Sequence, residues 1–455
     1  MKILLVRPRQ PEETIGLQHL MIVEPLELEV IGATVRQPNL VTVVDLILET
    51  EPLEHFLQRE RPDLVGFTSY ITNVGVVHDL ARRTKKVNPS ITTVVGGTHA
   101  EVCPQDFDIP EIDFRVVRNA PVQFPRLLDF LEHAGPAPDA VLPPGERPDA
   151  SQLPDFDFTY PLPRRDLTAR YRNRYFYLYQ DHVALVKTSF GCPYSCNFCF
   201  CHVLTEGQYH VRDLQSVLDE IEGLTEREVY IVDDDFLISR ERVLAFIDGL
   251  NARGIRKKFQ IYGRADFIAA NPDVIARFRA AGLSVVIIGL ESFDDEELAS
   301  YHKGLEAKIN CAAMDVLNSN GIDAYATIIL SPEWKREDFA RLDQYMKRLK
   351  IRFANLQPLT PLPGIGYRVD ESQLVERRDD WPKWDLAHVT IRPAFLSKEE
   401  FYAETIRLYE RMIWSPGNIV KNLKYPVHMQ WRIFRGLARV HRQYQKELRE
   451  AAAHA

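Results

Sequence analysis

The chain up to residue 133 alternates short apolar runs with segments in which apolar residues recur at helical spacing. The runs are five to seven residues long and rich in β-branched side chains, as is typical of strands buried on both faces of a sheet. The runs are Lys2–Val6, Leu40–Leu46, Leu64–Thr68 and Ile91–Val95, and the helical segments are Leu26–Val35, Leu53–Arg61 and Val74–Lys86. The alternation predicts a doubly wound parallel sheet whose ligand lies at the carboxyl ends of the strands.

A second alternation of strand and helix patterns begins at Val183. Its strand candidates are 183–189, 228–233, 259–263, 284–290, 322–330 and 351–357. Its helical patterns are 213–224, 240–253, 272–281, 305–319 and 336–349. This order predicts a partial (β/α)6 barrel, and the chemistry of such barrels lies at the carboxyl ends of the strands.

The two alternations are separated by a proline-rich stretch, because residues 136–163 hold eight of the 29 prolines. Such a composition favours an extended connection over a packed element. After Pro363 the pattern is irregular and aromatic, and it ends in a helical stretch from Tyr425 to Glu450. We therefore predict an α/β protein with a doubly wound domain (1–133), a linker (134–180), a barrel (181–362) and a mostly helical carboxyl-terminal region (363–455).

Composition narrows the class of protein. The chain has 455 residues, 45% hydrophobic and 26% charged, which excludes a disordered or disulfide-rich protein. Its net charge of -8 argues against nucleic acid as a partner. No apolar run reaches the roughly 18 residues of a membrane span, and the amino terminus does not resemble a secretory signal. The sequence therefore predicts a cytoplasmic location.

The carboxyl-terminal region is basic within this acidic protein. Residues 404–450 contain ten Lys or Arg and four Glu. A solvated helix face is the simpler interpretation. The alternative is peripheral contact with an anionic surface such as the inner membrane, because aromatic and basic side chains interleave as an interfacial helix requires. These side chains are Trp414, Trp431, Phe434, Arg432, Arg435 and Arg439.

Small and hydroxyl-bearing residues follow two strands of the first predicted sheet. Thr68 and Ser69 end the third run, and the fourth is followed by Gly96-Gly97-Thr98-His99. Glycine lets a bulky ligand approach the backbone, and hydroxyl groups can form hydrogen bonds with it. The GxGxxG fingerprint of dinucleotide-binding domains is absent from this region.

Four of the six cysteines fall within ten residues. Cys192, Cys196 and Cys199 have CxxxCxxC spacing and follow the first barrel strand. Three thiolates at this spacing can hold three irons of a [4Fe-4S] cluster and leave the fourth iron open. A structural zinc site is the alternative, but it needs a fourth ligand, for which Cys201 or His202 would have to fold back.

The cysteine motif resembles that of the radical S-adenosylmethionine (SAM) family, in which an aromatic residue, here Phe198, precedes the third cysteine. The resemblance implies that Cys192, Cys196 and Cys199 ligate the cluster and that SAM chelates the open iron and is cleaved to a 5'-deoxyadenosyl radical. An external electron donor such as a flavodoxin or ferredoxin is then required. Cys201 has no counterpart in the motif and is expected to be a nearby free thiol.

Polar residues at three further strand ends fit the same template. By the resemblance, Asp234, Arg264, Glu291 and Ser292 contact SAM. A divalent metal at the carboxylates is the alternative, although it leaves the thiols unexplained. For His302 and Lys303, a solvated surface role and a substrate contact both stay open.

A Rossmann-like domain before such a barrel is similar to the module of the cobalamin-dependent radical SAM subfamily. The resemblance implies that cobalamin binds at the carboxyl edge of the sheet, near Thr68, Ser69, Gly96, Gly97, Thr98 and His99. The DxHxxG motif that supplies a cobalt-ligating histidine elsewhere is absent, and a GEGE-like loop of relatives is replaced by residues 118–121. We therefore expect no protein ligand on the lower cobalt face. A domain that binds nothing is the alternative.

Most members of this subfamily are methyltransferases that carry a methyl group from SAM through methylcobalamin to an unactivated carbon. The segments 360–367 and 381–404 resemble those of members that act on large apolar molecules, notably the hopanoid C-3 methylases. The resemblance therefore implies a polycyclic, lipid-like substrate, with C-3 of the hopanoid A ring as the preferred prediction. Methylation of a bacteriochlorophyll side chain, a cyclase or ring-rearranging reaction and a non-catalytic corrinoid sensor are the alternatives.

Overall fold

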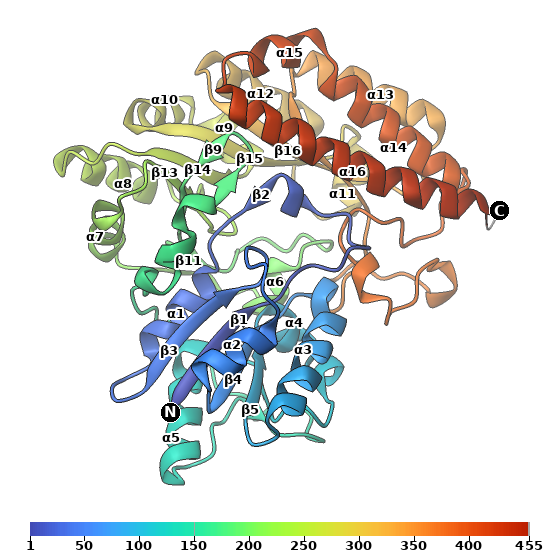
Figure 1. Ribbon diagram of the computed structural model, residues 1–455. Coiled ribbons are helices and arrows are strands. Elements are labelled where there is room, and N and C mark those ends of the chain that lie inside the picture. The colour runs from blue at the N-terminus through green and yellow to red at the C-terminus, as the bar shows by residue number, and fades with distance from the viewer. Residues whose placement is uncertain (150, 454–455) are drawn as a thin grey trace. The chain divides into compact units, whose positions relative to one another are not determined.

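The computed structural model describes residues 1–149 and 151–453, whose helices and strands are shown in Figure 1. The chain divides into two compact units. Unit 1 comprises residues 1–14, 24–174 and 379–385, and unit 2 comprises residues 15–23, 175–378 and 386–455. No helix in the described part of the chain is long and apolar enough to cross a membrane.

Unit 1 is built on a sheet with the strand order β3-β1-β4-β5-β6-β7. The strands are β1 (Lys2–Arg7), β3 (Leu40–Asp45), β4 (Leu64–Thr68), β5 (Thr92–Gly96), β6 (Phe114–Val116) and β7 (Val141–Leu142). All pairs are parallel except β6 with β7. The helices are α1 (Leu26–Thr34), α2 (Leu53–Glu60), α3 (Val74–Val87), α4 (Thr98–Val102) and α5 (Ala120–His133). The doubly wound sheet predicted from the sequence is confirmed.

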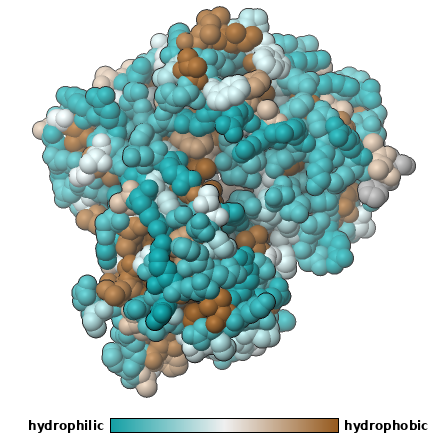
Figure 2. All heavy atoms as spheres, viewed as in Figure 1, coloured by the Kyte–Doolittle hydropathy of each residue, from teal (hydrophilic) through white to brown (hydrophobic). Residues whose placement is uncertain are grey.

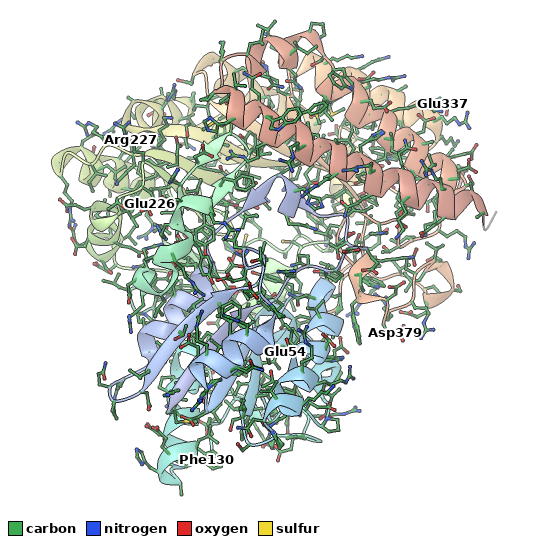
Figure 3. All side chains as sticks on the ribbon, viewed as in Figure 1. Glu54, Phe130, Glu226, Arg227, Glu337 and Asp379 are labelled. Carbon is green, nitrogen blue, oxygen red and sulfur yellow. The ribbon has the colours of Figure 1, made fainter. Side chains whose placement is uncertain are left out.

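The continuous apolar runs are explained by helices on both faces of this sheet. Ile3 and Leu5 of β1 pack in a core that includes residues of α1 and α5. Leu4 and Val6 pack in the opposite core, with residues of α2 and α3. On the surface, Glu54 of α2, labelled in Figure 3, accepts a 2.6 Å hydrogen bond from Nε of Arg83 in α3. The central residues of β1 are therefore buried, whichever face they point to.

The range 134–180, predicted to be a linker, contributes folded structure, and its residues up to Arg174 belong to unit 1. Val141 and Leu142 form β7 and extend the sheet beyond β6. Residues Arg165–Arg174 form a 3-10 helix in which Tyr171 is buried and donates a 2.5 Å hydrogen bond to Oε1 of Glu49. A two-residue strand and a polar 3-10 helix leave no periodic pattern, so the proline content dominated the sequence prediction.

Unit 2 contains a second six-stranded sheet, in the order β10-β13-β14-β15-β16-β17, in which all strands are parallel. The strands are β10 (Val183–Val186), β13 (Glu228–Ile231), β14 (Lys258–Gly263), β15 (Leu283–Glu291), β16 (Asp323–Leu330) and β17 (Phe353–Pro358). The connecting helices are α7 (Leu214–Gly223), α8 (Arg240–Ala252), α9 (Ala265–Ala270), α10 (Pro272–Ala281), α11 (Asp295–Ser300), α12 (Ala307–Ser319) and α13 (Arg336–Arg348). This order matches the predicted partial barrel.

The carboxyl-terminal region is helical, as predicted, and shares the core of unit 2. It forms α14 (Lys398–Ile413), α15 (Pro416–Asn422) and α16 (Val427–Ala453). Tyr444 of α16 is buried, and its ring centroid lies 6.3 Å from that of Tyr402 in α14. Short strands complete the unit: β2 (Met21–Ile22), β8 (Phe176–Tyr177) and β9 (Gln180–Asp181) form one small sheet, and β11 (Ser189–Phe190) pairs with β12 (His210–Val211).

Gly97 lies where β5 ends and α4 begins, and it requires glycine for two reasons. Its φ of 99° is in the left-handed region that side chains disfavour. A Cβ atom at this position would lie 2.7 Å from the backbone nitrogen of Ser69 and 2.8 Å from its carbonyl oxygen. The close approach of two strand-end loops therefore depends on the absence of a side chain.

We expect Gly97→Ala to destabilise unit 1 by about 1–3 kcal/mol, because it adds a backbone clash to conformational strain. Gly145→Ala is the matched control, since Gly145 also has a positive φ, of 79°, but open space around its Cβ position. Urea denaturation of both variants measures the difference. Equal costs for the two substitutions would show that the approach to Ser69 is not a constraint.

Candidate functional site

The cysteine loop of unit 2 is held at both ends by a short antiparallel ribbon. β11 ends directly before Gly191, and its Phe190 pairs with His210 of β12. Gly191 has a φ of 73°, and a Cβ atom there would lie 1.9 Å from the carbonyl oxygen of Gln208. Cys192, Cys196 and Cys199 therefore lie on one closed loop beyond the first barrel strand, as the sequence predicted.

Asp233 fixes the start of this loop to the second barrel strand. Its buried carboxylate accepts hydrogen bonds from the backbone nitrogens of Thr188, at 2.6 Å, and Ser189, at 3.0 Å. The hydroxyl of Ser189 donates to the same carboxylate at 2.8 Å. Burial raises the pKa of Asp233, whereas the hydrogen bonds from Thr188 and Ser189 oppose that shift. The first residue of the Asp-Asp-Asp segment therefore has a structural role.

The arrangement of the three cysteines fits a polynuclear cluster better than one zinc ion. Zn–S bonds of about 2.3 Å in a tetrahedron place sulfur atoms about 4 Å apart. In the described part of the chain, the sulfur atoms of Cys192, Cys196 and Cys199 do not all lie within 4.8 Å of one another. A [4Fe-4S] cluster, by contrast, binds each thiolate to a different iron and needs wider spacing.

Cys201 lies beside Cys199, at the start of α6 (Cys201–Leu204). A hydrogen bond from the Cys201 thiol lowers the pKa of Cys199 to about 7. Hydrogen bonding to Cys199, burial and the neighbouring charge of Asp234 raise the pKa of Cys201 well above its ordinary value. Cys201 is therefore a half-buried thiol next to a cluster-ligand candidate.

Arg264, at the carboxyl end of β14, places its positive charge on the cysteine loop. Its guanidinium carbon lies 3.7 Å from the ring centroid of Tyr194, and Nη1 lies 3.8 Å from Sγ of Cys196. Nη2 donates to the carbonyl oxygen of Lys303 at 2.9 Å and to Oδ2 of Asp266 at 3.0 Å. These contacts fix the planar guanidinium between two neighbouring strand ends.

Lys303 and Glu291 form a buried ion pair beside the same loop. Nζ of Lys303 lies 2.9 Å from Oε1 of Glu291, and both side chains are buried. The ring of Phe198 lies 5.9 Å from Nζ. Glu291 has a φ of 59° at an irregularity in the pairing of β15 with β16, which turns its side chain at the strand end. Because Lys303 is buried, the alternative of a solvated surface role for it is wrong.

The remaining residues predicted to contact SAM differ in orientation. Ser292 is buried and turned toward α11, where its hydroxyl binds Glu297 and accepts a 3.0 Å hydrogen bond from the backbone nitrogen of Asp294. Asp234 is half-buried and lies near Cys201. Ser292 therefore orders the strand end, and Asp234 stays a predicted SAM contact.

Asp235 is the buried carboxylate of this edge that offers an unused acceptor. Its Oδ1 accepts a 2.9 Å hydrogen bond from the backbone nitrogen of Leu237, whereas Oδ2 has no hydrogen-bond partner among the described atoms. Burial raises the pKa of Asp235 to about 7. Nearby, burial raises the pKa of Tyr262, yet 37% of that residue is exposed. Tyr262 is therefore partly exposed at the end of β14.

In unit 1, the predicted cobalamin residues lie together at the carboxyl edge of the sheet. The hydroxyl of Ser69 donates to the carbonyl oxygen of Gly96 at 2.8 Å, and Thr98 lies one residue beyond Gly97. His99 is buried, and its Nε2 lies 2.8 Å from Oδ2 of Asp106. Ser69 and His99 thus stabilise the loops that border this edge.

Two further residues, Tyr70 and Glu27, lie at this edge. Tyr70 follows β4, and Glu27 lies at the start of α1. The charge of Glu27 and burial raise the pKa of Tyr70, although 43% of Tyr70 is exposed. Burial likewise raises the pKa of Glu27, with Thr68 hydrogen-bonded to it. Tyr70 is therefore partly exposed at the edge of the sheet where Thr68 ends β4.

Breaking the buried pair beside the cysteines has a measurable cost. We expect Lys303→Met to destabilise unit 2 by about 3–5 kcal/mol, because it leaves the charge of Glu291 buried without a partner. Lys303→Met combined with Glu291→Gln should recover most of the loss. Urea denaturation of the cluster-free protein provides the measurement, with Lys308→Met, in an exposed pair with Glu306, as a control without effect. No recovery in the double variant would contradict the pairing.

Two family profiles match this chain, and it is similar to several known proteins. A sequence profile for the B12 binding domain matches residues 14–128, and one for the radical SAM superfamily matches residues 186–346. The hopanoid C-3 methylase of Methylococcus capsulatus is 28% identical over 418 residues, which cover 90% of this chain and 78% of that protein. The anaerobic magnesium-protoporphyrin IX monomethyl ester cyclase of Rubrivivax gelatinosus is 26% identical over 80% of this chain and 68% of that protein.

The fold has a counterpart among solved structures. The radical SAM methyltransferase TsrM from Kitasatospora setae, solved with cobalamin and a [4Fe-4S] cluster, superposes with a TM-score of 0.69 at 15% identity, over 100% of this chain and 99% of that chain. The two matched profiles, their order along the chain and the CxxxCxxC loop all indicate the same family. The cofactors are cobalamin, SAM and a [4Fe-4S] cluster, and the chain belongs to the cobalamin-dependent radical SAM methyltransferase family.

Proposed function

We propose that this protein transfers a methyl group from SAM, by way of cobalamin, to an unactivated carbon of a large apolar substrate. The observation that carries the proposal is the cysteine loop with two cations against it, Arg264 and Lys303, at the carboxyl edge of a partial barrel. Paired with a B12 binding domain, this edge has the groups that radical methylation requires. An sp³ carbon is a poor nucleophile toward a sulfonium, so a radical route is chemically necessary.

Each named side chain has a role in this proposal. Cys192, Cys196 and Cys199 hold the cluster, which with SAM and cobalamin supplies an adenosyl radical and a transferable methyl group when bound. Asp234 and Asp235 provide carboxylate acceptors for the SAM amino group. Glu291, held by Lys303, and Arg264 are placed to orient the remaining polar groups of SAM and to balance the charge of the thiolates.

In unit 1, we propose that Thr68, Ser69 and the 96–99 loop border the corrin ring of cobalamin. Gly97 lets the ring approach the backbone, and Tyr70 faces the same space. No histidine of this edge is directed to it, since His99 is buried against Asp106. The lower cobalt face is therefore proposed to be without a histidine ligand.

For the substrate, we propose C-3 of the hopanoid A ring. Support comes from the name and coverage of the Methylococcus relative. The segment 360–367 also lies against the cysteine loop, because the backbone nitrogen of Tyr367 donates to the carbonyl oxygen of Asn197 at 2.7 Å. In the second substrate-like segment, Trp384 is buried and serves packing. A polycyclic lipid substrate further implies that the protein acts peripherally at the inner membrane surface. Reductive cleavage of SAM requires an external electron donor, for which we propose a flavodoxin or ferredoxin.

Other reactions share the same machinery. The Rubrivivax relative is named a cyclase, which favours a cyclase or ring-rearranging reaction as the second candidate, and a bacteriochlorophyll side chain is a further methyl acceptor. These candidates differ in their products, since only methyl transfer adds a carbon from SAM. A corrinoid sensor would differ from all of them, because it would tolerate loss of the three cysteines.

An experiment can distinguish the cluster ligands from the neighbouring thiol of Cys201. Anaerobically reconstituted Cys199→Ala should lose the SAM-responsive cluster, whereas Cys201→Ala should keep it, because Cys201 lies outside the CxxxCxxC spacing. Iron and sulfide analysis with paramagnetic resonance measures both variants. A cluster that survives in Cys199→Ala and is lost in Cys201→Ala would overturn the ligand assignment.

One isotope-labelling experiment can identify both the reaction and the substrate class. With SAM carrying a deuterated methyl group, we expect a single trideuterated methyl group in the hopanoid fraction of a lipid extract, detected by mass spectrometry. The Cys196→Ala variant is the control that lacks the radical step. Formation of 5'-deoxyadenosine with an unlabelled, rearranged product would favour the cyclase, and a labelled tetrapyrrole would replace the hopanoid as substrate.

A further inference from the structure

The carboxyl-terminal region holds an unusual one-sided charge. Residues 411–446 contain eight Lys or Arg and no Asp or Glu, in a chain whose net charge is -8. Part of this charge is used internally, since Arg432 pairs with Asp181 and Arg411 lies 3.2 Å from Asp343. Lys424, Arg435 and Arg439 are exposed and form no ion pair that the described residues show. A positive surface is therefore left for an external partner.

Large apolar side chains are exposed on the same segment. Fourteen are exposed among the described residues, and seven of these fall within residues 414–434. The seven, which we name the apolar patch, are Trp414, Ile419, Val420, Leu423, Val427, Trp431 and Phe434. Figure 2 shows hydrophobic atoms gathered at the top of the view, where Figure 1 places α15. Clustering of this kind marks an interaction surface, whereas scattered exposed apolar residues need no explanation.

The packing of α16 directs the patch outward. Ile433, Gly436 and Tyr444 are buried on one face of the helix. Val427, Trp431 and Phe434 follow at intervals of four and three residues and therefore share another face. The rings of Trp431 and Phe434 stack at 5.7 Å between centroids, with 59% and 51% of the residues exposed. These three residues of the apolar patch thus belong to a helix whose other face packs in the core.

We propose that the apolar patch, with the basic residues beside it, docks unit 2 on an anionic phospholipid bilayer. The indole and aliphatic side chains enter the boundary between headgroups and acyl chains, while Arg435 and Arg439 contact lipid phosphates. The proposal rests on the proposed function only for its purpose, which is access to a lipid substrate.

A bilayer fits this surface better than two other occupants. Nucleic acid matches the positive charge, but it offers nothing to the aliphatic side chains of Val420, Leu423 and Val427. A second copy of the chain would have to bring one uniformly basic surface against another, which like-charge repulsion opposes. An anionic membrane satisfies both the charge and the apolar side chains.

The test is co-sedimentation of the full-length protein, loaded with its cofactors, with vesicles of phosphatidylcholine alone or mixed with phosphatidylglycerol. We expect binding to the mixed vesicles that weakens as salt is raised. Trp431→Ala with Phe434→Ala should weaken it about tenfold or more. Arg435→Gln with Arg439→Gln should weaken it about 25-fold, since each cation contributes about fivefold at such a surface.

Matched controls come from the other unit. Leu40→Ala removes an exposed apolar side chain and Arg82→Gln an exposed cation outside the patch, and both should bind vesicles like the unsubstituted protein. Equal binding by patch and control variants, no preference for anionic vesicles, or a dimer in light scattering that the patch substitutions abolish would overturn the proposal. Cleavage of SAM to 5'-deoxyadenosine should be unchanged in every variant, so failure of docking is distinguishable from failure of the proposed reaction.

Discussion

The carboxylate of Asp233 is the contact on which the radical site of unit 2 depends. It accepts hydrogen bonds from Thr188 and Ser189 and so fixes the strand that leads into the cysteine loop. An unpaired carboxylate in this position would be costly to bury, and the hydrogen bonds from Thr188 and Ser189 offset that cost. The loop can therefore project three thiols from the barrel edge without a core of its own.

Charge is the second organising element of that edge. Buried thiolates are unfavourable unless cations lie near them, and Arg264 and Lys303 both lower the pKa of Cys196 against the effect of burial. The cations are themselves buried, and they are held by Asp266 and Glu291. The site thus alternates positive and negative groups from neighbouring strand ends, which allows each to remain charged beneath the surface.

The last helix links this interior to the exterior. One face of α16 completes the core of unit 2, so deleting the carboxyl terminus would disturb the barrel as well as the surface. Point substitutions on the exposed face avoid that problem, because Trp431 and Phe434 contact each other and solvent. Because α16 packs directly in the core of unit 2, a partner bound at its exposed face is positioned relative to the barrel without an intervening hinge.

The sequence by itself determined the two sheets and the cysteine loop, because apolar runs of fixed period and the spacing of Cys192, Cys196 and Cys199 are local properties of the chain. It could not determine the partners of Lys303, which lies twelve residues after Glu291, or the inward turn of Ser292 and His99. The Lys303 pair depends on the φ of 59° at Glu291. Ser292 and His99 turn inward because the folded chain brings Glu297 and Asp106 within reach of them. Residues 134–180 show the same limit, because β7 exists only where β6 offers it a partner. Local pattern decides which element forms, whereas only tertiary structure decides which charge meets which.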